Sequence, residues 1–75
     1  MRLTFVCKTP DSRPVDDCPS FYRTDEGSWI VQGRRRDEPE IRAQLRYLKD
    51  DETFLEIPDS LVRRFLEMYV RGAIQ

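Results

Sequence analysis

The clearest pattern of apolar and polar positions along the chain predicts a β-hairpin. Two alternating segments, residues 20–24 and 28–32, flank the sequence Asp-Glu-Gly. A short loop that ends in glycine is typical of a type I turn followed by a left-handed residue and a bulge. We therefore expect residues 25–27 to form the loop of the hairpin.

This register sorts the hairpin side chains into two faces. One face resembles a core face and consists of Phe21, Arg23, Trp29 and Val31. The guanidinium group of Arg23 can lie over the indole ring of Trp29 as a cation–π pair. The other face is amphipathic and consists of Ser20, Tyr22, Thr24, Ser28, Ile30 and Gln32. We expect the second face to point away from the helices.

The segment before the hairpin predicts a strand followed by a loop. Residues 2–7 alternate, which places Leu3, Phe5 and Cys7 on one face. Residues 8–19 contain three prolines and three aspartates, and proline supplies no backbone donor. We predict that residues 8–19 form a flexible loop.

After the hairpin the periodicity changes to that of a helix. Residues 37–49 begin with a candidate cap and a proline, and they place Ile41, Leu45 and Leu48 on one stripe. This pattern predicts a three-turn amphipathic helix. Residues 53–57 then predict another strand.

Residues 58–71 predict a second helix that begins at Pro58 and ends before Gly72. Its apolar positions have the spacing of one buried stripe, which consists of Leu61, Val62, Phe65, Leu66 and Tyr69. The order β-β-β-α-β-α favours an α+β fold, with a small antiparallel sheet of three to four strands and two helices packed on one face. We expect residues 1–75 to form a single small domain.

Composition limits the core that this fold can build. The hydrophobic fraction is 39%, below the globular average of roughly 45–50%. A chain of 75 residues also buries a smaller share of its surface than a larger domain does. The sequence therefore allows one thin core, and self-association is a natural way to enlarge it.

The residue types present argue against an enzyme. The chain has no histidine, which removes the commonest general base and the commonest zinc ligand. Its three glycines are isolated and form no phosphate-binding loop, and two cysteines cannot complete a zinc site in one chain. We predict no catalytic residue, metal site, cofactor or small-molecule substrate, with Cys7 and Cys18 present as reduced thiols.

The distribution of apolar residues also indicates the environment of the protein. The longest apolar runs are three residues long, and the N-terminal segment has no extended apolar region. We therefore expect a cytoplasmic protein without a membrane span or a signal peptide.

Several short motifs lie between residues 18 and 60. They are a Cys-Pro pair, an aromatic residue, Thr-Asp, a glycine and a β segment ending in Val-Gln-Gly, here Cys18, Pro19, Tyr22, Thr24, Asp25, Gly27, Val31, Gln32 and Gly33. A later strand is represented by Leu55, Glu56, Ile57 and Pro58. This half of the chain resembles a family of small, uncharacterised actinobacterial proteins of the Streptomyces type. The resemblance implies no activity, but it implies a regulatory partner, since some such proteins are encoded near helix-turn-helix regulators.

The amphipathic face of the hairpin predicts a protein-interaction module. Interfaces favour aromatic residues and arginine, and the chain has eight aromatic residues. We expect a protein partner, either a second copy or a transcriptional regulator, bound through Tyr22, Trp29, Ile30 and Gln32. The open alternative is a structural role, in which both sheet faces are half-buried and the N-terminal loop covers the second face.

Nucleic-acid binding is the alternative function, through Arg34, Arg35, Arg36, Arg63 and Arg64. Such binding would fall steeply with salt. Against it, 13 basic residues are balanced by 14 acidic residues, so the net charge is −1. Successive residues of a strand also point to opposite sides, so Arg35 points away from Arg34 and Arg36. The three side chains therefore do not form one patch. We interpret the triplet as the seam between a strand and a helix, where solvated arginines pair with nearby acids.

Overall fold

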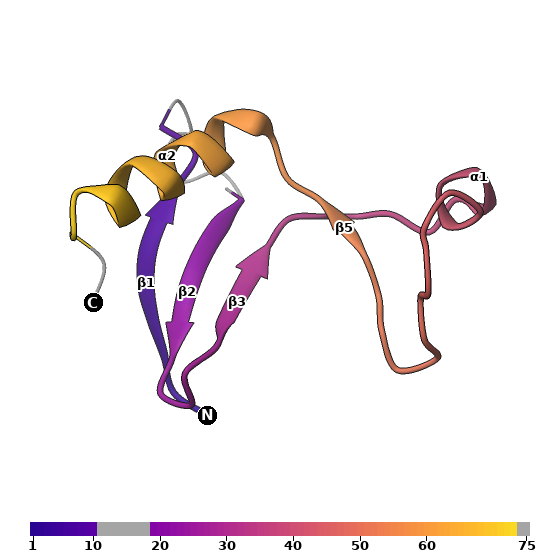
Figure 1. Ribbon diagram of the computed structural model, residues 1–75, viewed down its shortest axis with the longest axis horizontal. Helices are drawn as coiled ribbons and strands as arrows, with labels where there is room; N and C mark the ends of the chain where they lie inside the picture. The colour runs from indigo at the N-terminus through magenta and orange to yellow at the C-terminus, as the bar shows by residue number, and fades with distance from the viewer. Residues whose placement is uncertain (11–18, 74–75) are drawn as a thin grey trace.

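An antiparallel sheet carries one helix on one face and continues at one edge into an arm (Figure 1). The computed structural model describes residues 1–10 and 19–73. Its elements are β1 Leu3–Lys8, β2 Ser20–Thr24, β3 Trp29–Gln32, β4 Arg34–Arg35, α1 Pro39–Arg42, β5 Leu55–Glu56 and α2 Asp59–Val70. The main sheet has the order β1-β2-β3, and β4 and β5 form a second, two-stranded sheet. The α+β class and the predicted order of elements are confirmed.

The β2–β3 hairpin has the register that the alternation predicts. The Thr24 N–H donates to the Ser28 carbonyl at 3.0 Å, which closes the loop over residues 25–27. Gly27 has a φ of 78°, a conformation that glycine adopts without steric cost. The Thr24 side-chain oxygen also accepts hydrogen bonds of 3.1 Å from the N–H groups of Glu26 and Ser28. The buried threonine therefore holds the turn in place.

The pairing of β1 with β2 is interrupted by a bulge. Phe5 lies opposite Tyr22, and Cys7 lies opposite the residue that precedes Tyr22, so Val6 is the extra residue. The bulge turns Cys7 toward the helix side and leaves Phe5 on the other side. The expectation that Leu3, Phe5 and Cys7 share one face is therefore wrong.

An aromatic cluster joins α2 to the sheet. The ring centroid of Phe65 lies 4.2 Å from that of Phe21 and 4.9 Å from that of Trp29. The Arg23 guanidinium lies over the Trp29 ring at 5.4 Å, as predicted. Leu61, one turn before Phe65, is fully buried. The core face assigned from the hairpin pattern is confirmed.

The predicted buried stripe of α2 is only partly buried. Leu61 is buried and Phe65 is half-buried, but Val62, Leu66 and Tyr69 are exposed. A sheet of three short strands covers only part of an apolar surface this wide. The prediction of one buried stripe is therefore wrong for these three residues.

α2 begins one residue later than the sequence predicts, at Asp59, and it ends before the predicted glycine. Pro58 is the N-cap residue, and Gly72 follows the helix with a φ of 75°. The Ala73 N–H donates to the Met68 carbonyl at 3.0 Å, which is the bond of a Schellman motif. Glycine at this position therefore stops the helix.

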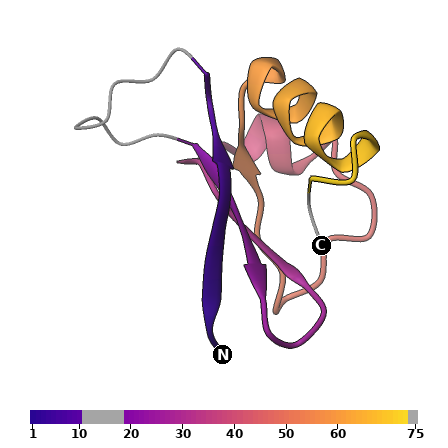
Figure 2. The same ribbon diagram turned by 90° about the vertical axis from the view of Figure 1, so that its left-hand side faces the viewer.

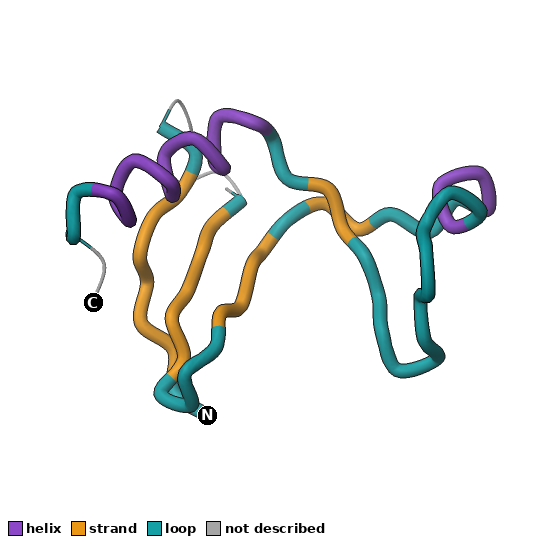
Figure 3. Tube along the Cα trace, viewed as in Figure 1, coloured by secondary structure: helices purple, strands orange, loops and turns teal. Residues whose placement is uncertain are grey.

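The first predicted helix, residues 37–49, is reduced to the single turn α1. The N–H groups of Gln44 and Leu45 bond to carbonyls three residues back, at 3.0 and 3.2 Å, and Tyr47 has a φ of 61°. A helix depends mainly on the packing of its apolar face, and Figure 3 shows α1 at the far end of the arm, away from the main sheet. Only α2 lies on the sheet, in place of the two helices expected there.

Gly33 joins the main sheet to the arm, where β4 and β5 pair antiparallel. A Cβ at Gly33 would lie 2.6 Å from the carbonyl oxygen of Glu56 and 2.7 Å from Cγ2 of Ile57. A side chain at this position would displace the backbone of β5. Glycine is therefore required where the arm leaves the sheet.

Only the ends of the predicted loop over residues 8–19 belong to the described residues. Lys8 is the last residue of β1, and the Thr9 N–H donates to the Pro19 carbonyl at 3.2 Å. Residues 11–18, at the centre of this prediction, lie outside the described part of the chain.

Replacing Gly33 with alanine should lower the free energy of unfolding by about 1–3 kcal/mol, because the new Cβ overlaps backbone that must move. Urea unfolding monitored by circular dichroism measures this change. The control is Gly27→Asn, which keeps a residue tolerant of positive φ and should cost less than about 1 kcal/mol. An unchanged unfolding midpoint for Gly33→Ala would contradict the close approach of the two segments.

Candidate interaction surfaces

The sheet face opposite α2 carries the residues that the hairpin pattern placed on its amphipathic face. Tyr22 and Ile30 are partners across β2 and β3, and Phe5 lies opposite Tyr22 across β1 and β2. The Phe5 and Tyr22 rings meet edge to face, with centroids 5.8 Å apart. With Leu3 and Gln32, these residues form what we call the outer sheet face.

The outer sheet face is apolar and accessible. Leu3, Phe5 and Ile30 keep 47%, 55% and 40% of their surface exposed. The Tyr22 hydroxyl donates to Oε1 of Gln32 at 3.3 Å, which fixes a polar group at the side of the apolar surface. Figure 2 shows the sheet edge-on, with α2 on one side and no described helix on the other. An exposed apolar surface with a polar margin is typical of an interaction site.

Two members of this face, Leu3 and Phe5, were not expected from the sequence. Their alternation with Cys7 predicts a shared core face, and only the bulge at Val6 separates them. No residue type in β1 signals this bulge, because the extra residue is specified by pairing with β2.

Trp29 does not belong to the outer sheet face. It lies on the helix side of the sheet, half-buried between Phe65 and Arg23. The structure therefore brings together Tyr22, Ile30 and Gln32 of the predicted partner-binding set and places Trp29 on the opposite side.

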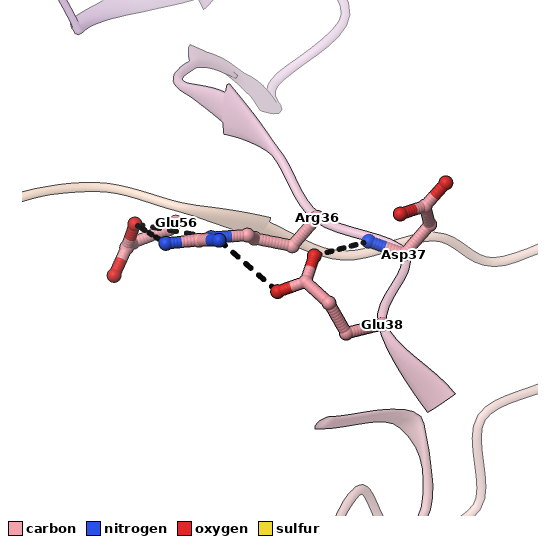
Figure 4. Close-up of polar contacts among 4 residues, drawn as sticks. All are labelled: Arg36, Asp37, Glu38 and Glu56. Atoms are coloured by element: carbon pink, nitrogen blue, oxygen red, sulfur yellow. Dashed lines mark hydrogen bonds and ion pairs between the residues drawn. The ribbon is translucent and has the colours of Figure 1, made fainter. Parts of the chain in front are cut away.

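Arg36 links the two segments at the base of the arm (Figure 4). Its Nε and Nη2 donate to Oε1 of Glu56 at 3.3 and 3.1 Å, and its Nη1 donates to Oε2 of Glu38 at 3.0 Å. The other oxygen of Glu38 accepts from the Asp37 N–H at 3.2 Å. Hydrogen bonding to Glu56 and the negative charges of both glutamates raise the pKa of Arg36. Arg36 therefore pairs with an acid that follows it in its own segment, Glu38, and with an acid in β5, Glu56.

The other arginines of the proposed nucleic-acid site lie on separate elements. Arg34 and Arg35 are exposed in β4. Arg63 donates to Asp59 at 2.7 Å, and Arg64 lies 3.4 Å from Glu67. The carboxylates beside these arginines would compete with phosphate for them, and the nucleic-acid site stays a prediction.

Two observations on the described residues concern metal binding and thiol chemistry. No group of three or more metal-ligating side chains occurs among residues 1–10 and 19–73. Burial raises the pKa of the Cys7 thiol, while the charge of Arg64 acts in the opposite direction. A raised pKa keeps the thiol protonated and weakly nucleophilic at neutral pH.

A shallow hollow of about 630 Å³ lies in the arm between α1 and β5. Its charged lining includes Arg36, Glu38 and Glu56, which are already bonded to one another. Phe54 also lines the hollow, and the Arg42 guanidinium lies 5.3 Å from the centre of its ring. These contacts join residues 36–42 to residues 54–56 within the arm.

The helices in the described part of the chain are too short or too polar to cross a membrane. In comparisons with known proteins, the chain matches no family model, no curated protein and no solved structure. The resemblance to the actinobacterial proteins therefore stays a prediction that depends on the residues quoted for it.

Replacing Arg36 with glutamine should loosen the arm, because Glu38 and Glu56 lose the cation that they share. We expect faster backbone amide exchange in β4 and β5, measured by NMR hydrogen exchange. Arg35→Gln, which changes an exposed neighbour, should leave these rates unchanged. Identical exchange rates in wild type and Arg36→Gln would show that the ion pairs do not hold the arm.

The Cys7 thiol should react with iodoacetamide more slowly than a free cysteine at neutral pH, by about tenfold or more, because it is buried and protonated. Mass spectrometry of a Cys18→Ser variant follows the reaction at this single thiol. The same variant in urea should react at the rate of the free amino acid. Rapid alkylation of the folded variant would contradict the burial of Cys7.

Proposed function

We propose that the chain is a non-enzymatic interaction module that binds a protein partner through the outer sheet face. The observation that carries this proposal is the exposure of Leu3, Phe5 and Ile30 on a face that no described helix covers. Burial of apolar surface is the main favourable term in protein association. These side chains supply that term, and Tyr22 and Gln32 supply groups that can set the orientation of a partner.

The small core of the chain supports the same proposal. Among the described residues, Cys7 and Leu61 are the buried apolar side chains. A thin core gives the isolated chain a small stability margin, and binding of a partner to the folded state raises it by mass action. The module therefore gains stability when its outer sheet face is covered.

The partner that the sequence resemblance implies is a transcriptional regulator. This finer assignment depends on that resemblance alone, and the identity of a captured protein would test it. Aromatic and amide side chains on an exposed sheet face fit a folded protein surface, where aromatic residues act as anchors.

Affinity capture from lysate of the source organism, with nuclease present, tests the proposal. Wild type should retain one stoichiometric protein, and Ile30→Glu should lose it, because a carboxylate on the outer sheet face is left unpaired after burial. The matched control is Tyr47→Glu in the arm, where the replaced side chain is 88% exposed and lies outside this face. Retention by Ile30→Glu would overturn the outer sheet face as the site. Loss of all binding with nuclease would favour the arginines and nucleic acid instead.

A further inference from the structure

A second apolar surface lies on α2, on the part of the helix that the sheet does not cover. Val62, Leu66 and Val70 follow one another at four-residue spacing, with Tyr69 beside them. Their exposed fractions are 44%, 59%, 77% and 57%, respectively. Residues three and four apart are neighbours on a helix, so these side chains form one continuous surface. We call these four residues the α2 stripe.

A row of charges with alternating sign runs beside the α2 stripe, and it consists of Asp59, Arg63, Glu67 and Arg71. Within the helix, Arg63 pairs with Asp59 at 2.7 Å and Arg71 pairs with Glu67 at 2.8 Å. The four side chains are between 48% and 82% exposed. Exposed pairs of this kind contribute little to the stability of a single chain. The charges therefore stay available to a neighbouring molecule.

We propose that α2 pairs with α2 of a second copy of the chain in antiparallel orientation, with stripe against stripe. In this orientation Asp59 lies opposite Arg71 of the second copy, and Arg63 lies opposite Glu67 of the second copy. A parallel pair related by a two-fold axis would place the two charge rows on opposite sides of the contact, where they could not pair with each other. The order of charges along α2 therefore fits a second copy related by a two-fold axis.

The apolar side chains fit the same orientation. Leu66 lies near the centre of the charge row, so a two-fold axis through this region brings the two Leu66 side chains together. Val62 then lies opposite Val70 of the second copy. Antiparallel helices also place the positive end of one helix dipole beside the negative end of the other.

The size of the α2 stripe suits a dimer of modest affinity. Contiguous exposed apolar patches above roughly 300–600 Å² mark interaction sites, and a standard interface buries about 800 Å² per partner. Two valines, a leucine and a tyrosine over about two and a half helical turns supply the apolar centre of such an interface. The charge row supplies a polar rim of the kind that surrounds interface cores.

This dimer goes beyond the proposed function and does not depend on it. The outer sheet face lies on the opposite side of the sheet from α2, so it remains accessible when two helices pair (Figure 2). A two-fold dimer would present two copies of the outer sheet face to a partner. Variants on the two surfaces therefore separate the two proposals.

Sedimentation equilibrium of the full chain tests the dimer with two matched variants. Leu66→Glu should weaken the dimer by about 100-fold or more, because each copy places an unpaired charge near the axis. Phe5→Glu, on the outer sheet face, should leave the dimer unchanged. The replaced side chains are 59% and 55% exposed, so both variants should keep the fold, as circular dichroism can verify. A monomeric wild type at about 100 μM, or a dimer that survives Leu66→Glu, would overturn the proposal.

A crosslinking measurement tests the orientation without Leu66→Glu. In a Cys18→Ser background, Val62→Cys and Val70→Cys chains are mixed and oxidised, with the buried Cys7 left in place. The antiparallel pair predicts a disulfide between the two different variants in preference to either variant with itself. Preferential crosslinking of Val62→Cys with itself would indicate a parallel pair and overturn the proposal.

Discussion

The contact of Phe65 with Phe21 and Trp29 is the interaction on which the arrangement of the sheet and α2 depends. Aromatic pairs contribute about 0.5–1.5 kcal/mol beyond the burial of their area. A chain of this length has a total stability on the order of 4–11 kcal/mol, so this cluster supplies a large share. By fixing α2 to one side of the sheet, Phe65 also keeps this helix away from the outer sheet face.

The thin core and the two apolar surfaces have one physical cause. Three short strands and one helix give too little area for every apolar side chain to be buried inside a single chain. Among the described residues, the outer sheet face and the α2 stripe hold seven of the large apolar side chains that remain exposed. Because these surfaces lie on opposite sides of the sheet, one can serve self-association while the other binds a different protein.

The elements that the sequence predicts correctly are those whose structure depends on neighbouring residues. The hairpin follows from its alternation and from Gly27, and the end of α2 follows from Gly72. The parts that sequence could not predict depend on distant contacts. The segment after Arg42 leaves the helical conformation because the arm carries it away from the sheet, and the bulge at Val6 arises from pairing with β2. For the same reason, the sequence assigns Tyr22 to the outer sheet face, but it does not assign Leu3 and Phe5 of β1 to it.

Both proposals require that association covers apolar side chains that the core of a single chain leaves exposed. Thermal unfolding of the full chain over about a hundredfold range of concentration tests it directly, because a dimer formed only by folded chains raises the midpoint by mass action. The midpoint should rise with protein concentration in wild type and stay constant in a variant that cannot pair through α2. A wild-type midpoint that does not change with concentration would contradict it.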